Sequence, residues 1–268
     1  MNIKITTLVE NCVKGRGLMA EHGLSMLIER EGNLVLFDTG ASSLFIDNAK
    51  YLGKEIEDID FLILSHGHSD HTGGLKAFLN LNSKAKVVCK SSILVPKYRG
   101  NRENGIVDVN DIDISRFIFI DNLTEIINGI FILPNIEIKN KYDTHFSNFE
   151  LMTEQGRIND LFDDELAIVV INENKMSILS ACSHRGITNI ISSARRYFPT
   201  HKFNYLVGGF HLVDSSPKDA LFISEFFKND MPEKIGICHC TGIESYSIFK
   251  NEFNDRVFYN FCGSEFIV

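Results

Sequence analysis

Four side chains of types that commonly bind metal ions lie within six residues of this sequence. His66, His68, Asp70 and His71 form the run His-x-His-x-Asp-His. With nine histidines in 268 residues, a chance match to this spacing is on the order of one in a thousand. In an extended backbone His66 and His68 project to the same side, so they can share one ion. Neutral imidazoles and a carboxylate suit Zn²⁺, Fe²⁺ or Mn²⁺.

The second half of the run can serve a second ion. Asp70 and His71 lie where the chain turns toward a helix, beside the first pair. Two ions about 3.5–4 Å apart can hold a bridging hydroxide and polarise a substrate oxygen. The glycines Gly67, Gly73 and Gly74 leave room for a close backbone approach. The alternative is that these are surface histidines beside a helix N-terminus. Packing does not explain why four such residues follow a strand end.

The elements that position this run alternate between short apolar strands and helices. The continuous apolar segment 61–64 predicts a buried strand directly before the run. We expect a helix over 75–79 after it, an irregular segment over 91–115 and loops over 140–163. Strands are expected at 3–9, 25–29, 34–38, 87–88, 117–120, 129–133, 166–171, 176–181, 205–207, 235–238 and, as a terminal pair, near 257 and 266; helices are expected at 43–52, 188–197, 218–227 and 244–253. The pattern predicts an α/β chain with two sheets covered by helices, in one domain spanning 1–268.

Composition excludes several classes of protein. The net charge is −8 and no basic block occurs, which argues against nucleic acid as a partner. No apolar run approaches the roughly 20 residues that cross a bilayer, so no membrane association is expected. The first ten residues lack the order of a signal peptide, and six scattered cysteines are too sparse for a disulfide framework. A cytoplasmic location is therefore predicted.

Together these residues resemble a known family. The run at 65–71 resembles the His-x-His-x-Asp-His signature of the metallo-β-lactamase superfamily, and 36–40 resembles its Asp-Thr-Gly element. Further blocks are similar to one subgroup, whose namesake is a dihydropterin-ribofuranosyl-aminobenzene-phosphate synthase. These blocks are 21–25, 182–190, 208–212 and 239–242.

The resemblance implies a fold and a set of metal ligands. The fold would be an αββα four-layer sandwich, with two mixed β-sheets flanked by helices. His66 and His68 would bind one metal ion, and Asp70 and His71 the other. Asp38 would accept a hydrogen bond from the ligand loop and fix its orientation. The expected cofactor is a pair of divalent ions, with zinc first and iron or manganese as alternatives.

The later ligands depart from the superfamily pattern. No Gly-Asp pair follows the strand at 176–181, and Cys182 stands roughly where the bridging aspartate is expected. His184 can reach the same cleft, and His239 ends a strand as the last superfamily histidine does. Cys182 is either a ligand or an inert buried thiol, and His211 either a ligand or a pocket-lining histidine. His145 sits in a polar context typical of the surface.

Other residues are candidates for contact with substrate. Arg185, close to a helix start, can bind an anion, and His22 can line the pocket. Lys97, Arg99 and Arg102 can also hold an anionic group, because guanidinium and ammonium match phosphate. Solvated surface charge is the favoured interpretation for these three.

The resulting functional hypothesis is a dinuclear metal-dependent hydrolase. A metal-bound hydroxide would attack a small metabolite, with a phosphorylated pterin-like or nucleotide-like compound implied by the subgroup, and Asp70 would act as ligand and proton acceptor. A non-catalytic metal-containing metabolite sensor and a di-iron oxidoreductase are the alternatives. The expected partner is a small molecule, and a homo-oligomer is left open.

Overall fold

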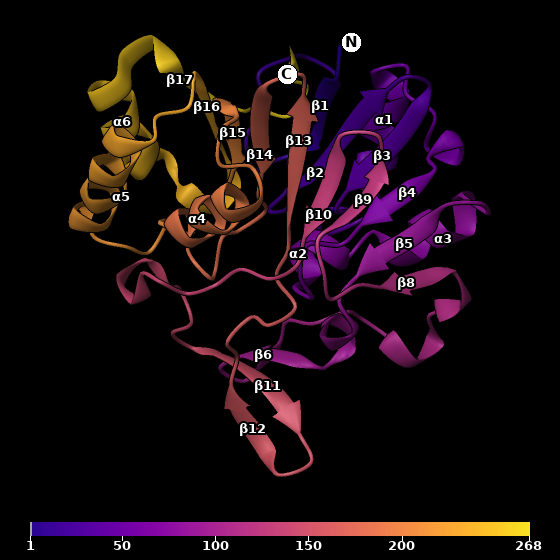
Figure 1. Cartoon of the computed structure of the whole chain (residues 1–268). Helices are drawn as coiled ribbons and strands as arrows, with labels where there is room; N and C mark the ends of the chain where they lie inside the picture. The colour runs from indigo at the N-terminus through magenta and orange to yellow at the C-terminus, as the bar shows by residue number, and fades with distance from the viewer. Residues whose placement is uncertain (1) are drawn as a thin grey trace. The chain divides into compact units, whose positions relative to one another are not determined.

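The computed structural model describes residues 2–268, in a chain that divides into two compact units (Figure 1). Unit 1 comprises the residues up to Asp121 together with Phe146–Asp164 and Phe261–Ile267. Unit 2 comprises Asn122–His145, Glu165–Asn260 and Val268. Among the described residues, no helix has the length and apolar character needed to cross a membrane.

Unit 1 is built on a seven-stranded mixed sheet. Its strands lie in the order β18-β1-β2-β3-β4-β5-β8, antiparallel from β18 to β3 and parallel from β3 to β8. β4 is short and apolar, as expected of a strand between two parallel neighbours. The bounds are β1 (Lys4–Val9), β2 (Ser25–Arg30), β3 (Asn33–Phe37), β4 (Phe61–Ile63), β5 (Lys86–Cys89), β8 (Phe117–Phe119) and β18 (Glu265–Ile267).

Helices cover this sheet with an apolar core between them. Phe45 of α1 and Phe78 of α3 are fully buried and belong to one cluster with Leu36 and Leu62 of the strands. A short helix, α2, directly follows the histidine run and carries its last residues. The bounds are α1 (Leu44–Tyr51), α2 (Ser69–Thr72) and α3 (Leu75–Leu81), with 3₁₀ turns η1 (Ile56–Asp58), η2 (Ser91–Leu94), η3 (Val109–Asp111) and η4 (Ile114–Arg116).

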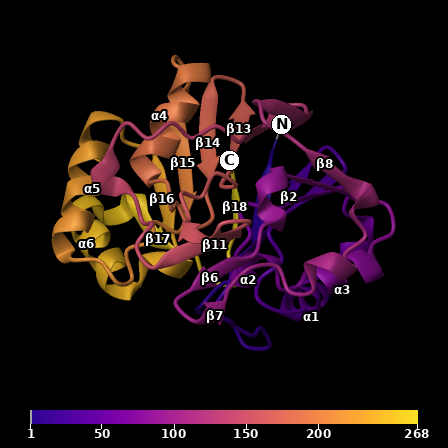
Figure 2. The same ribbon diagram turned by 90° about the horizontal axis from the view of Figure 1, so that it is seen from below.

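Unit 1 also contains a small antiparallel sheet, in the order β12-β11-β6-β7 (Figure 2). The strands are β6 (Lys97–Arg99), β7 (Arg102–Glu103), β11 (Phe149–Thr153) and β12 (Gly156–Asn159). The expectation of an irregular segment over 91–115 and loops over 140–163 is therefore wrong in part. These strands are short and form two local hairpins, β6–β7 and β11–β12. The pairing of β11 with the distant strand β6, which local pattern does not report, joins the hairpins into one sheet.

Unit 2 repeats the layout with a second seven-stranded sheet, in the order β17-β16-β15-β14-β13-β10-β9. Buried side chains of α4, α5 and α6 belong to one apolar cluster with its strands. Figure 1 shows these three helices beside the strands β14 to β17. The bounds are β9 (Thr124–Ile127), β10 (Ile130–Leu133), β13 (Ala167–Asn172), β14 (Lys175–Leu179), β15 (Lys202–Gly208), β16 (Lys234–Ile237), β17 (Val257–Tyr259), α4 (Ile187–Tyr197), α5 (Pro217–Asn229), α6 (Ile243–Phe253), η5 (Lys141–Asp143), η6 (His239–Thr241) and η7 (Asn254–Arg256).

Both sheets share one strand pattern, an antiparallel run that continues into a parallel run. In unit 1 the parallel strands are β3, β4, β5 and β8, and in unit 2 they are β14 to β17. The expected α/β class with two mixed sheets is confirmed. The terminal strand pair expected near 257 and 266 is wrong, because β17 pairs with β16 whereas β18 pairs with β1.

A buried asparagine joins α3 to the turn that precedes β4. Its side-chain amide donates to the carbonyl oxygens of Ile56 and Ile59, each at 2.9 Å, and its oxygen accepts the N–H of Ala85 at 2.7 Å. Asn82 itself is 0% exposed. The side chain thereby fixes the entry into β4, the strand that leads to the histidine run.

Truncation of this side chain tests its structural role. We expect Asn82→Ala to lower the free energy of unfolding by about 2–4 kcal/mol, because several buried backbone groups lose their partners. Asn229→Ala, at the exposed end of α5, should cost less than about 0.5 kcal/mol. Urea denaturation followed by circular dichroism measures both, and similar losses would contradict the assigned role.

Candidate functional site

In unit 1 the predicted ligand run lies just beyond the carboxyl end of β4, the usual place for ligand-binding residues in an open α/β sheet. The side chains of His66, His68 and His71 are buried, at 0%, 3% and 0% exposure. The ring centroid of His66 lies 4.7 Å from that of His68 and 4.4 Å from that of His71. Three imidazoles from the sequence motif are therefore brought together.

The fourth member of the run, Asp70, lies beside the same rings. Its Oδ2 atom is 3.8 Å from Nε2 of His71 and 3.3 Å from Nε2 of His22. His22 is 67% exposed, and its Nδ1 atom lies 3.1 Å from the side-chain nitrogen of Asn11. The structure thus places His22, predicted as pocket-lining, next to the carboxylate of Asp70.

Asp38 connects two of the histidines from the end of β3. Its carboxylate accepts the N–H and the hydroxyl of Ser65, both at 2.7 Å, and bonds Nδ1 of His71 at 2.7 Å. Asp38 is fully buried and has a φ of 60°, in the left-handed region that aspartate tolerates better than most residues. The predicted hydrogen bond from the ligand loop is present in the structure.

These contacts determine which nitrogen each imidazole presents. A carboxylate at Nδ1 of His71 requires the proton there, so Nε2 carries the lone pair. The Ser65 hydroxyl, which donates to Asp38, lies 2.9 Å from Nδ1 of His66 and accepts its proton. Both Nε2 atoms are then in the form that binds a metal ion.

Burial keeps the imidazoles of His66 and His68 neutral. It lowers the pKa of His66 well below the usual 6.5, and neighbouring His71 and His68 add to the effect. Burial also lowers the pKa of His68 to about 3, against the opposing charge of Asp70. Because a metal ion binds the neutral imidazole, these two residues need not lose a proton to bind one near neutral pH.

A buried ion cluster supports the loop from behind. The N–H of Gly67 donates to Oδ2 of Asp164 at 2.7 Å, and Oδ1 of Asp164 accepts from Nζ of Lys97 at 3.0 Å. Asp160 also accepts from Lys97. Burial lowers the pKa of Lys97, but the charges of Asp164 and Asp160 outweigh it and raise the pKa overall. The ammonium therefore stays charged.

The surface interpretation of Lys97 is therefore wrong, because its side chain is 2% exposed. The partners of Lys97 lie more than 60 positions away, in a segment that the sequence pattern predicted as loop. Phe162, between these two aspartates in sequence, lies 5.1 Å from Nζ and packs edge-on against His68 at 5.1 Å. The cluster and the ring together hold the ligand loop in place.

Unit 2 carries its candidate residues at the ends of three parallel strands. Cys182 and His184 follow β14, His211 follows β15 and His239 follows β16. The donor atoms of Cys182, His184 and His211 all lie within 4.8 Å of one another, and the His184 and His211 ring centroids are 4.1 Å apart. Cys182, His239 and Cys240 form a second group on the same criterion. Cys240 joins this second group because the chain forms the 3₁₀ turn η6 directly after β16.

Two features of this group were missed from sequence. The buried carboxylate of Glu165 accepts the N–H groups of His184 at 2.6 Å and Arg185 at 2.7 Å. His145, predicted as a surface residue, has a side chain only 13% exposed. Its carbonyl oxygen accepts from Nδ1 of His184 at 3.2 Å, and its ring centroid lies 5.4 Å from that of His211. The surface interpretation of His145 is therefore wrong.

The reason for the error at His145 is the turn at η5, which precedes it. The carboxylate of Asp143 accepts the N–H and hydroxyl of Thr188 in the first turn of α4, which anchors the segment. This contact spans 45 residues and leaves no local signal. Arg185, predicted to bind an anion, donates from Nε to the carbonyl oxygen of Ile136 at 3.1 Å.

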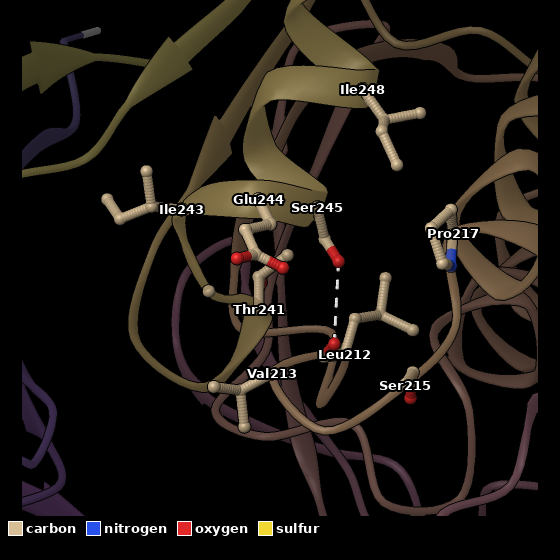
Figure 3. A pocket seen from close by; sticks show the side chains of 10 residues that line it. Leu212, Val213, Ser215, Pro217, Thr241, Ile243, Glu244, Ser245 and Ile248 are labelled. Atoms are coloured by element: carbon tan, nitrogen blue, oxygen red, sulfur yellow. Dashed lines mark hydrogen bonds between the residues drawn. The ribbon is translucent and has the colours of Figure 1, made fainter.

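A pocket of about 310 Å³ opens in unit 2 beside the His211 and His239 turns (Figure 3). Its wall is largely apolar, with a few hydroxyls and one carboxylate. Ser245 donates to the carbonyl oxygen of Leu212 across it at 3.4 Å. The side chains shown include Leu212, Val213, Pro217, Thr241, Glu244 and Ile248.

Known proteins share both sequence and fold with this chain. Residues 19–150 match the model of the metallo-β-lactamase superfamily. A 7,8-dihydropterin-6-methyl-4-(β-D-ribofuranosyl)-aminobenzene-5'-phosphate synthase of Methanocaldococcus jannaschii is 30% identical, over 95% of this chain and 92% of that one. An uncharacterised protein of the same organism is also 30% identical, over 90% and 91%.

Two solved structures share the fold of this chain. The chain is similar to a metal-dependent hydrolase of the β-lactamase superfamily, with a TM-score of 0.88 and 33% identity over 99% of both chains. It is also similar in fold to the metallo-β-lactamase-fold protein YhfI of Bacillus subtilis, with a TM-score of 0.59 and 12% identity over the full length of both. The predicted fold class is confirmed.

The lowered histidine pKa values predict how stability depends on pH. Below about pH 6.5 the unfolded imidazoles bind protons while buried His66 and His68 do not, so acid favours the unfolded state. For metal-depleted protein we expect a loss of roughly 1.4 kcal/mol per pH unit and per histidine between pH 6.5 and 4. Denaturant titrations should show a shallower loss for His68→Gln and an unchanged one for Asn229→Ala, at an exposed, non-titrating position of α5. An unaltered slope in His68→Gln would refute this account.

Removing the buried ammonium tests the ion cluster. We expect Lys97→Met to lower the free energy of unfolding by about 3–5 kcal/mol, because two buried carboxylates lose their counter-charge. Lys84→Met is the matched control, since Lys84 forms a half-exposed pair with Asp60 and should cost about 0–1 kcal/mol. Equal losses in chemical denaturation would show that the cluster contributes no more than a surface pair.

Proposed function

Because the chain belongs to the metallo-β-lactamase superfamily, we propose that it is a metal-dependent, hydrolase-type enzyme acting on a small phosphorylated metabolite. The observation that supports this most directly is the Asp38 contact pattern, which prepares Nε2 of His71 and His66 for a metal ion. We further propose that residues 1–268 act as one functional domain in the cytoplasm.

The donor chemistry fits divalent metal ions. Unit 1 offers three imidazoles with a carboxylate beside them, and unit 2 offers imidazoles with thiols. Imidazole with carboxylate or thiolate suits zinc, while iron or manganese would favour the imidazole and carboxylate donors. We propose two ions. The proposed ligands are His66, His68, Asp70, His71, His184 and His239, with Cys182 and His211 as further candidates.

Each polar residue then has a distinct task. When bound, the ions would supply activated water and stabilise negative charge that develops on the substrate. Asp38 orients the imidazoles. Asp70 can take a proton at Oδ2, and His22, 3.3 Å away and exposed, can pass it to solvent. The proposed catalytic residue is therefore Asp70.

The substrate class rests on the named relative, whose product is a phosphate ester by name. That relative is a synthase, whereas the structurally similar protein is described as a hydrolase. A phosphorylated pterin-like or nucleotide-like substrate would be consistent with the name of the synthase. The apolar pocket beside His211 offers room of about 310 Å³ for a ring system.

Metal retention is the test of this proposal. We expect Asp38→Asn to weaken metal affinity about 10–100-fold, because the amide cannot accept the His71 proton in the same way. Asp47→Asn, an exposed aspartate of α1, should leave it unchanged. Metal content after dialysis against a graded chelator, measured by mass spectrometry, gives both values, and a metal-free wild type would refute the proposal.

Turnover separates an enzyme from a sensor. Metal-loaded protein should release product from at least one member of a panel of phosphate esters, phosphodiesters and lactones, and His66→Ala with His68→Ala should abolish it. Tight metabolite binding without product across the whole panel would favour the sensor instead.

A further inference from the structure

The small sheet of unit 1 presents two arginines on one face. β6 pairs with β7 in antiparallel register, with Arg99 opposite Arg102, and with β11, with Arg99 opposite Phe149. Directly opposed residues of antiparallel strands project to the same face. Arg99, Arg102 and Phe149 therefore share a face, and the guanidinium of Arg99 lies 5.3 Å from the centre of the Phe149 ring.

That face continues to the proposed metal ligands. The Phe149 ring lies 4.9 Å from the ring of His68, in a tilted stack. The guanidinium of Arg99, the Phe149 ring and the imidazole of His68 thus form consecutive layers within unit 1. The positive charge of Arg99 also contributes to the lowered pKa of His68, after burial and nearer charges.

Two contacts hold the β6–β7 hairpin on the ligand loop. Both contacts lie at its open end, where the N–H of Asn104 donates to the carbonyl oxygen of Lys97 at 2.8 Å. There the carbonyl oxygen of Asn104 accepts the N–H of Ser69 at 2.9 Å, one residue after His68, and Lys97 reaches the Gly67 N–H through the carboxylate of Asp164. The two arginines flank the turn at the other end of this short hairpin and are exposed to solvent.

The opposed positive charges of Arg99 and Arg102 favour the binding of an anion. Like charges directly opposite each other on paired strands are destabilising. Lys97, on the same face, is buried against Asp160 and Asp164, whereas Arg99 and Arg102 are exposed and accessible to a ligand. A dianion between two guanidinium groups relieves their repulsion, and guanidinium pairs in a bidentate way with phosphate oxygens.

We propose that Arg99 and Arg102 form a recognition site for a phosphate group of the substrate, on the face of the β6–β7 hairpin that carries Phe149 against His68. The identity of this phosphate as part of a substrate rests on the proposed function, whereas the anion site itself does not. The ring of Phe149 provides an apolar surface beneath the guanidinium of Arg99.

Isothermal titration of the metal-loaded full chain with inorganic phosphate tests the site. We expect R99Q/R102Q to raise the Kd for phosphate at least tenfold. The matched control is R196Q, because Arg196 is an exposed arginine of α4 in unit 2 that pairs with Glu137 at 2.9 Å. It should change the Kd less than twofold. Acetate should bind at least tenfold more weakly than phosphate, because one charge cannot match two guanidinium groups.

The outcomes separate this site from the metal chemistry. An unchanged phosphate Kd in R99Q/R102Q overturns the proposal, as does an equal loss in R196Q. Acetate affinity equal to that of phosphate overturns the assignment to phosphate. Metal content and thermal stability are measured on every variant, so that misfolding is recognised. If the wild type retains no metal, the proposed function fails, while a loss of phosphate binding confined to R99Q/R102Q still supports the anion site.

Discussion

A single buried carboxylate organises the candidate site of unit 1. Asp38 bonds two groups of Ser65 and the ring of His71, and through the Ser65 hydroxyl its influence extends to His66. A buried carboxylate is tolerated only when its oxygens are satisfied. The hydrogen bonds that compensate the buried carboxylate of Asp38 therefore also orient the imidazoles. The same contacts stabilise the loop and position the imidazole nitrogens for a metal ion.

The candidate residues follow the topology of the sheets. In each unit they stand just after the carboxyl ends of parallel strands, where the chain leaves the sheet and its side chains converge. Asp38, Ser183, His211 and His239 all have positive φ values, between 49° and 60°. Such conformations carry strain that the surrounding packing must offset, and they are concentrated at functional sites. Sharp turns at strand ends thus bring functional groups together.

The small sheet of unit 1 combines a buried ion cluster with exposed arginines. A buried lysine between two aspartates fixes it behind Gly67, and its exposed end carries two opposed arginines. The buried charge stabilises the position of the hairpin, whereas the exposed charges are available to a ligand. One strand of three residues thus contributes both a structural and a recognition element.

The sequence by itself determined the α/β class and the strands that flank the histidine run at 66–71, because both depend on short-range apolar periodicity. The role of Asp38 as a hydrogen-bond acceptor came from the family resemblance, and the structure shows its contacts with Ser65 and His71, 27 and 33 positions away. Only the tertiary structure revealed the burial of Lys97, the position of His145 and the contacts of Glu165. Each depends on partners 19 to 67 positions away, and a carboxylate or lysine has the same local signature whether its partner is a distant residue or water.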